Sequence, residues 1–175
     1  IAAQLLTQDF LTTANLVHAI ADVGGTIDAI RTKDDLAISY RLRALKHATP
    51  QIDRVFLTDG SGTLWTDYPQ IPDVFGRSEA DSAWYKGVVA RKNIYISDVY
   101  VRPQDQSSPV IAIAAPVSDG SGGTLGILVF EYRTEQIERW LDSIRPGNAG
   151  QMYLLDGHDR VISHPALADT ADNRD

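Results

Sequence analysis

The chain has 175 residues, no cysteine and a formal net charge of −7 at pH 7. The acidic balance argues against non-specific nucleic-acid binding, which needs a basic surface. The lack of cysteine excludes disulfides, thiolate metal sites and a cysteine nucleophile. A hydrophobic content of 43% and a charged content of 22% are typical of a globular protein with a buried core.

The first 48 residues predict two helices. Apolar side chains recur near the helical period through residues 1–23, which predicts one long amphipathic helix that ends at the glycine pair beginning with Gly24. A second helix is expected from an N-cap at Asp34 to about His47, carrying the apolar stripe of Leu36, Tyr40, Leu42 and Leu45. We therefore expect a helical lead-in before the rest of the fold.

The rest of the chain repeats one hairpin signal. Apolar runs enter Asp-Gly pairs at residues 55–60, 115–120 and 152–157, and each is followed by another strand-like run. Glycine adopts a positive φ without steric penalty, so Asp-Gly between apolar runs favours a tight antiparallel turn. Residues 110–117 and 124–132 give the strongest strand patterns, and a short helix is expected within 80–90.

Six blocks of sequence occur in a recognisable order along the chain. They are residues 55–60, 76 with 84–87, 95–100, 113–117, 126–129 and 153–165. In this order they resemble a Cache domain, the PAS-like extracytoplasmic sensor family of bacterial chemoreceptors, sensor histidine kinases and diguanylate cyclases. No single block is specific to this family, whereas the order of the six blocks is.

The resemblance implies an α+β fold, with a PAS-like antiparallel sheet flanked by helices and preceded by a long N-terminal helix. By analogy with the double-Cache form, residues 1–48 form the N-terminal helical region and residues 49–145 form the membrane-distal ligand-binding module. Residues 146–175 are then the incomplete start of a membrane-proximal module. No apolar run approaches the ~20 residues of a membrane span, so membrane anchoring is expected through segments outside this chain.

In amino-acid-binding members of the family, the resemblance implies an aromatic cradle with an acid that takes the ligand ammonium. By position, Trp84, Tyr85 and Tyr100 match the aromatic residues, and Glu131 stands where the family usually has aspartate. Aromatic faces attract cations, and a carboxylate adds charge-assisted hydrogen bonds to an ammonium. Strand alternation places Glu131 on the same face as Val129.

The family's arginine, which takes the ligand carboxylate, is not matched. Ser82 stands at its position, and Arg77 occupies the position of an upstream tyrosine. Without that arginine a ligand carboxylate loses its bidentate partner, which favours a small amine over a free amino acid. Arg77 or Arg102 would restore carboxylate binding if either pointed inward.

These residues favour a non-enzymatic ligand-sensing domain, periplasmic or extracellular, of a bacterial transmembrane receptor, binding a small amine or amino-acid-like metabolite. One alternative is a sensor of small carboxylates through Arg77 and Arg102. Another is a structural or dimerisation module in which the aromatic residues are core. The four histidines form no metal-binding spacing, and no nucleophile motif is present, so no cofactor, metal or catalytic residue is expected. The apolar stripe of the first helix offers a homodimer seam.

Overall fold

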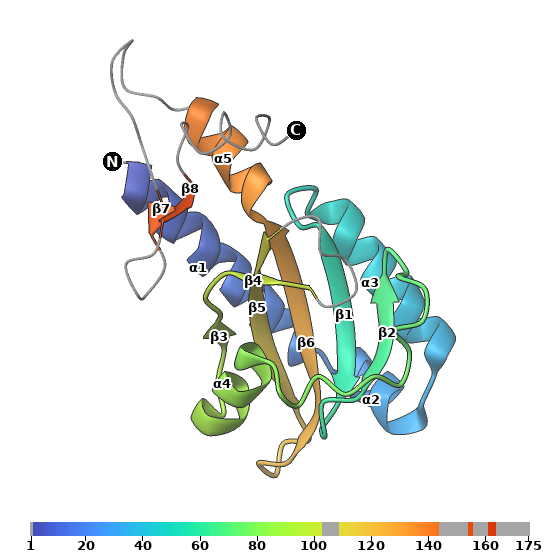
Figure 1. Cartoon of the computed structure of the whole chain (residues 1–175). Helices are drawn as coiled ribbons and strands as arrows, with labels where there is room; N and C mark the ends of the chain where they lie inside the picture. Colours follow the sequence, from blue (N-terminus) through green and yellow to red (C-terminus); the bar gives the residue numbers. More distant parts are fainter. Residues whose placement is uncertain (1, 103–108, 144–153, 156–160, 164–175) are drawn as a thin grey trace.

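A computed structural model of the chain describes residues 2–102, 109–143, 154–155 and 161–163 (Figure 1). Its centre is an antiparallel sheet in the order β2-β1-β6-β5-β3, with β4 also paired to β5. This arrangement confirms the α+β fold that was expected. The strands of the sheet are β1 (Arg54–Asp59), β2 (Leu64–Tyr68), β3 (Tyr95–Ile96), β4 (Tyr100–Val101), β5 (Pro109–Ser118) and β6 (Thr124–Arg133).

Two Asp-Gly turns join neighbouring strands, as predicted. In the β1–β2 hairpin, Asp59 Oδ1 accepts backbone hydrogen bonds from Ser61 at 2.9 Å and Thr63 at 2.9 Å. Asp119 accepts the equivalent bonds from Ser121 at 2.7 Å and Gly123 at 3.0 Å in the β5–β6 hairpin. The third Asp-Gly lies outside the described residues, between the antiparallel strands β7 (Leu154–Leu155) and β8 (Val161–Ser163).

Five helices are present in the described residues: α1 (Ala2–Ala21), α2 (Gly24–Thr32), α3 (Asp35–Ala48), α4 (Ala83–Arg91) and α5 (Thr134–Ser143). The N-cap expected at Asp34 is confirmed, because its carboxylate accepts the Ala37 N–H at 3.0 Å. The long N-terminal helix is present as α1, but the prediction that the glycine pair ends it was wrong. Gly24 begins α2, since the extended backbone of Val23 interrupts the helix, and the guanidinium of Arg41 occupies the space that a side chain at Gly25 would need.

Helices α1, α2 and α3 cover one side of the sheet, which we name the helical face (Figure 1). Its core is apolar: Ala14 and Val17 of α1 pack with Ile38 and Leu42 of α3 on side chains of the central strands. The strand residues buried on this face are Val55, Leu57, Ile111, Ile113, Ala115, Val117, Leu128, Phe130 and Tyr132. The helices of the lead-in therefore share one core with the sheet.

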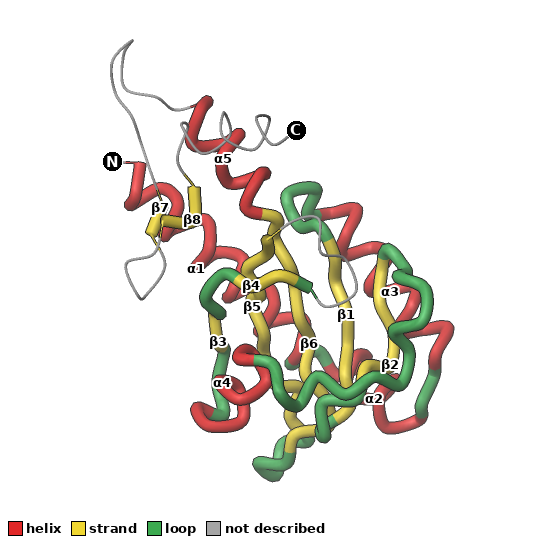
Figure 2. The backbone as a smooth tube through the Cα atoms, in the orientation of Figure 1, coloured by secondary structure: helices red, strands yellow, loops and turns green. Residues whose placement is uncertain are grey.

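The opposite side, named the α4 face, is covered by α4 and by the loop of residues 69–82, which crosses in front of the sheet (Figure 2). Strand alternation sends Phe56 of β1 and Val129 of β6 to this side. Its apolar cluster contains Phe56, Leu64, Val74, Trp84, Val88, Ala112, Ala114, Ile127 and Val129.

None of the described helices is both long enough and apolar enough to cross a membrane. The division at residues 48/49 and 145/146 stays a prediction, and most of 146–175 lies outside the described residues.

Candidate functional site

Glu131 is buried on the α4 face near the end of β6, with 2% of its surface exposed. It lies opposite Arg54 of β1 and Ala112 of β5 in the register of the sheet. The side chain faces the same way as Val129, as the alternation of the strand predicts. A carboxylate at this depth must be compensated by opposite charge or hydrogen bonds.

Three side chains compensate the carboxylate of Glu131. The Tyr100 hydroxyl donates to Oε1 at 2.5 Å, and the Arg102 Nε lies 3.1 Å from Oε2. The Arg54 Nη1 is further away, 3.8 Å from Oε2. Burial raises the pKa of Glu131, and the charges of Arg102 and Arg54 and the Tyr100 hydrogen bond offset only part of that rise.

The buried charges extend beyond Glu131. Arg54 donates to Asp67 Oδ2 from Nε at 3.1 Å and from Nη2 at 2.7 Å. Arg102 donates to Asp53, which also accepts from Arg133 Nε at 2.7 Å. Each carboxylate in this group therefore has at least one guanidinium beside it. We name the six side chains the ionic cluster: Asp53, Arg54, Asp67, Arg102, Glu131 and Arg133.

The cluster fixes the protonation of its neighbours. Burial, the charge of Glu131 and the hydrogen bond to Glu131 raise the pKa of Tyr100 well above its ordinary value. Burial alone would lower the pKa of Arg102, but Glu131 and Asp53 outweigh that effect and raise it. Tyr100 therefore remains a hydroxyl donor and Arg102 remains a cation.

Trp84 and Tyr85 begin the helix that covers this side of the sheet. Trp84 is 1% exposed and packs edge-on against Phe56, with ring centroids 5.5 Å apart. The Tyr85 hydroxyl donates to the Gly60 carbonyl at 3.1 Å, so this side chain fastens α4 to the β1–β2 hairpin. Both contacts hold α4 against the sheet.

Ser82 and Arg77 lie apart from the cluster. Ser82 caps α4, because its hydroxyl accepts the Tyr85 N–H at 3.3 Å and donates to the Glu79 carbonyl at 2.6 Å. Arg77 is exposed, and its carbonyl accepts the Leu64 N–H at 2.8 Å. Of the two arginines considered from the sequence, the structure brings only Arg102 next to Glu131.

Four members of the ionic cluster were not predicted: Asp53, Arg54, Asp67 and Arg133. The sequence held one signal for them: charged residues stand at the ends of apolar runs. Asp53 and Arg54 come directly before the apolar run of β1, and Arg133 is the last residue of β6. Within the described ranges, no set of three histidine, aspartate, glutamate or cysteine side chains is grouped as a metal ion would require.

Comparison with known proteins gives consistent results. A family model described as Cache domain matches residues 2–173. The methyl-accepting chemotaxis protein McpA of Bacillus subtilis is 23% identical over 141 residues, which is 80% of this chain and 20% of that protein. The chain thus spans about a fifth of this relative.

Two solved structures share the fold. The ligand-binding domain of the Pseudomonas fluorescens chemoreceptor CtaA, in complex with L-serine, has a TM-score of 0.72 and 17% identity, over 95% of this chain and 69% of that one. The ligand-binding domain of the Pseudomonas aeruginosa amino acid chemoreceptor PctC, in complex with GABA, has a TM-score of 0.63 and 20% identity, over 92% of this chain and 70% of that one.

Proposed function

The chain belongs to the Cache domain family, and we propose that it is the extracytoplasmic, non-enzymatic ligand-sensing domain of a bacterial transmembrane signalling receptor. The similarity to a chemotaxis protein and to chemoreceptor ligand-binding domains supports this role. Anchoring in the membrane would come from other segments of the receptor. The ligand would bind on the α4 face, at Glu131, Tyr100 and Arg102, with Trp84 behind them.

The ligand class follows from the charges at this site. The main observation is that Arg102 Nε lies 3.1 Å from Glu131 Oε2 in a buried cluster. An anion and a cation therefore lie side by side. A zwitterion presents the complementary pair, because its ammonium can bind Glu131 while its carboxylate binds Arg102. L-serine and GABA, the ligands named for the two similar chemoreceptor domains, are both zwitterions. We therefore favour an amino-acid-like metabolite over a simple amine.

Strand β6 offers a route for the signal. Glu131 faces the site, and the next residue, Tyr132, faces α1 on the other side of the sheet. The Tyr132 hydroxyl is 2.6 Å from the Thr13 hydroxyl, and its ring packs edge-on against Phe10 at 5.4 Å. A ligand that shifts β6 would move the contact with α1. It would bias signalling only if it bound one arrangement more tightly than the other.

We also propose that two copies pair along α1. The buried side of this helix includes Ala14 and Val17, whereas Leu11 and Leu16 are 54% and 38% exposed. A second copy would cover these leucines. Sedimentation of the chain and of Leu11→Lys tests the idea, because a dimer that uses this seam should dissociate in the variant.

A carboxylate sensor is the second candidate. Arg102 is 3% exposed and faces the site, so a small organic acid would displace Glu131 or Asp53 from its guanidinium. That displacement leaves a buried carboxylate without its partner, which is why we rank this ligand class second.

The test is calorimetric titration of the 175-residue chain with L-serine, GABA, ethylamine and acetate. The variants are Glu131→Gln and Tyr100→Phe, with Glu135→Gln on α5 as the matched control, since Glu135 is exposed. We expect the zwitterions to bind, and Glu131→Gln to weaken them at least tenfold, because a hydrogen bond to a charged group is worth roughly 1.5–3 kcal/mol. At 100 times its Kd, a ligand should add about 2.7 kcal/mol of stability.

Each other outcome has a distinct meaning. Binding of acetate that is indifferent to Glu131→Gln would support the carboxylate sensor and contradict the zwitterion. Binding of ethylamine as tight as that of L-serine would contradict a role for Arg102. If none of the four compounds bound, the zwitterion proposal would fail and the structural or dimerisation module, with the aromatic side chains as core, would be favoured.

A further inference from the structure

Helix α3 exposes apolar side chains that the core does not use. The stripe predicted from the sequence includes Leu36 and Tyr40, but these are 84% and 76% exposed. The buried face of α3 contains Leu42 of that stripe together with Ile38. Large apolar side chains exposed next to each other, here four residues apart on one helix, are typical of a binding surface.

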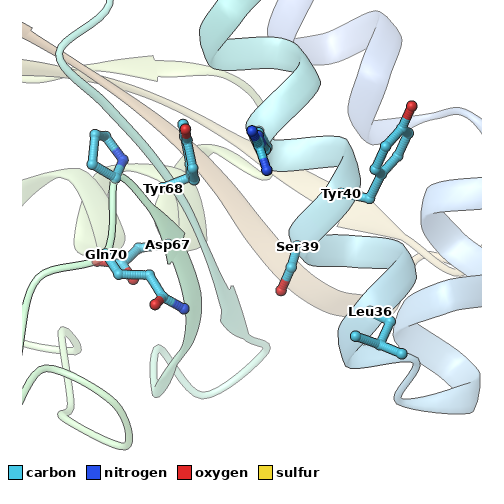
Figure 3. A pocket seen from close by; sticks show the side chains of 8 residues that line it. Leu36, Ser39, Tyr40, Asp67, Tyr68 and Gln70 are labelled. Atoms are coloured by element: carbon cyan, nitrogen blue, oxygen red, sulfur yellow. The ribbon is translucent and has the colours of Figure 1, made fainter.

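The end of β2 and the residues after it form the opposite side of a groove beside α3 (Figure 3). The groove has a volume of about 640 Å³, within the range of about 300–1,000 Å³ usual for small-molecule sites. Figure 3 shows Ser39 directed from α3 towards β2, with Tyr68 and Gln70 across from it. Leu36 and Tyr40 also line the groove.

The two sides of the groove are held in place by polar contacts. The hydroxyls of Ser39 and Thr66 are 3.3 Å apart, and the Tyr68 hydroxyl is 3.4 Å from His47 Nε2 at the end of α3. Asp67 Oδ2 accepts the Ile71 N–H at 3.0 Å, which fixes the turn after β2. The groove is therefore preformed.

The charge of the groove favours an anion. Arg43 lines it and is exposed, and it forms no ion pair with any carboxylate among residues 2–102 and 109–143. The acid that also lines the groove, Asp67, is already paired with Arg54 at 2.7 Å, so its charge is matched. In a chain with a net charge of −7, Arg43 is thus a cation that forms no ion pair with a carboxylate of the described residues.

We propose that this groove binds a small organic anion with an apolar body, such as an aromatic carboxylate, at a site separate from Glu131. The carboxylate would form bidentate hydrogen bonds with Arg43. The apolar body would lie on Tyr40 and Leu36, which are three and seven residues before Arg43 and so share its side of the helix. Ser39 and Gln70 would supply neutral hydrogen bonds.

The test uses benzoate and phenylacetate as probes, with amide chemical shifts of the ¹⁵N-labelled full chain as the readout. We expect saturable shifts at α3 and at the amides of Tyr68 and Gln70, and at least a tenfold rise in Kd in Arg43→Gln and in Tyr40→Ala. Arg139→Gln on α5 is the matched control, because Arg139 is also exposed on a helix, and its Kd should stay within twofold of the unmodified chain. Glu131→Gln should leave the benzoate Kd unchanged, which separates this proposal from the amino-acid site.

Three results would overturn the proposal. The first is the lack of saturable shifts with either probe up to 10 mM, a concentration on the order of the weakest useful affinity. The others are an equal loss of probe affinity in Arg43→Gln and Arg139→Gln, and saturable shifts that vanish in Glu131→Gln. A fourth would assign the surface to a protein interface instead, namely that Leu36→Ala and Tyr40→Ala change the sedimentation of the chain while neither probe binds.

Discussion

The side chains of the helical face and the α4 face alternate along the same strands, yet among the described residues only the α4 face buries a cluster of charges. On β6, Phe130 joins the apolar core under α1–α3, while Glu131 joins the ionic cluster. Apolar packing gains free energy with area and tolerates substitution gradually. Buried charges instead depend on every partner, because each ion has lost its hydration. We expect both faces to contribute to stability, the helical face through buried apolar area and the α4 face through its ion pairs as well. We propose that the α4 face retains its charges for binding.

The largest expected effect is from Arg54→Met. This change leaves Asp67 without its guanidinium and removes one of the cations near Glu131. Breaking a buried ion pair from one side costs about 3–5 kcal/mol, and urea denaturation should show a loss of this size. In the exposed Arg139→Met control the loss should stay within about 0.5 kcal/mol. A loss below about 1 kcal/mol in Arg54→Met would mean that the cluster is well hydrated, and the contrast between the faces would fail.

A matched change on the helical face is Leu128→Ala. Leu128 is 1% exposed and pairs in register with Leu57 and Ala115. We expect a loss of about 2–5 kcal/mol from the cavity, with the affinity of the folded protein for L-serine unchanged. Urea denaturation and calorimetry measure the two quantities. Val89→Ala, at a half-exposed position of α4, is the control for loss of methyl groups. A large fall in affinity in Leu128→Ala would show that the faces are not independent.

Local signals were sufficient to predict much of the fold. Asp59 and Asp119 each accept hydrogen bonds within their own turn, and Asp34 caps its own helix. These contacts span four residues or fewer, so the sequence pattern contains them completely. The strong strand patterns of β5 and β6 are long apolar runs, which also need no distant partner to be recognised.

The ionic cluster could not be predicted in the same way. Arg54, Asp67 and Glu131 come from three strands, and they meet only because β1 pairs with both β2 and β6 in a specific register. That register is a property of the whole sheet. The apolar stripe of α3 was correct only in part, for a related reason: Leu42 is buried as predicted, but Leu36 and Tyr40 are exposed, and Ile38, which the stripe did not include, is buried. Only the position of the neighbouring strand decides between the faces.

Ligand affinity measured as a function of pH tests the charge of the α4 face directly. Burial, offset in part by Arg102, Arg54 and Tyr100, raises the pKa of Glu131 above its ordinary value of 4.5. The ionised carboxylate attracts the ligand ammonium and the protonated acid does not. Affinity for L-serine should therefore fall as the pH decreases through this raised pKa, by roughly tenfold. Calorimetry from pH 8 to pH 4 measures it. Glu131→Gln keeps every histidine, so a flatter dependence of its L-serine affinity on pH would assign the effect to Glu131. Parallel pH dependences in the unmodified chain and in Glu131→Gln would contradict that assignment.

The smallest effect is expected from Asp59→Asn, which replaces a charge in the β1–β2 turn. Burial is the largest single influence on the pKa of Asp59 and raises it, but the hydrogen bonds from Ser61 and Thr63 together outweigh burial and lower the pKa below the ordinary value of 3.8. A lowered pKa means that the stabilisation is present above 3.8 and is lost as the pH falls through the folded-state value. Asparagine keeps the acceptor oxygen, so the loss at pH 7 should be below about 1 kcal/mol.

The measurement for Asp59→Asn is urea denaturation at pH 7 and near pH 3, with Asp28→Asn on the exposed side of α2 as the matched control. The difference between the unmodified chain and Asp59→Asn should shrink as the pH falls through the lowered pKa of Asp59, since protonation removes the charge that the turn stabilises. This direction is opposite to that of Glu131, whose raised pKa weakens stability as the pH rises. A difference that stayed constant with pH would show that the charge of Asp59 contributes nothing. The pH dependence of stability would then not distinguish the carboxylate of the exposed turn from that of the buried cluster.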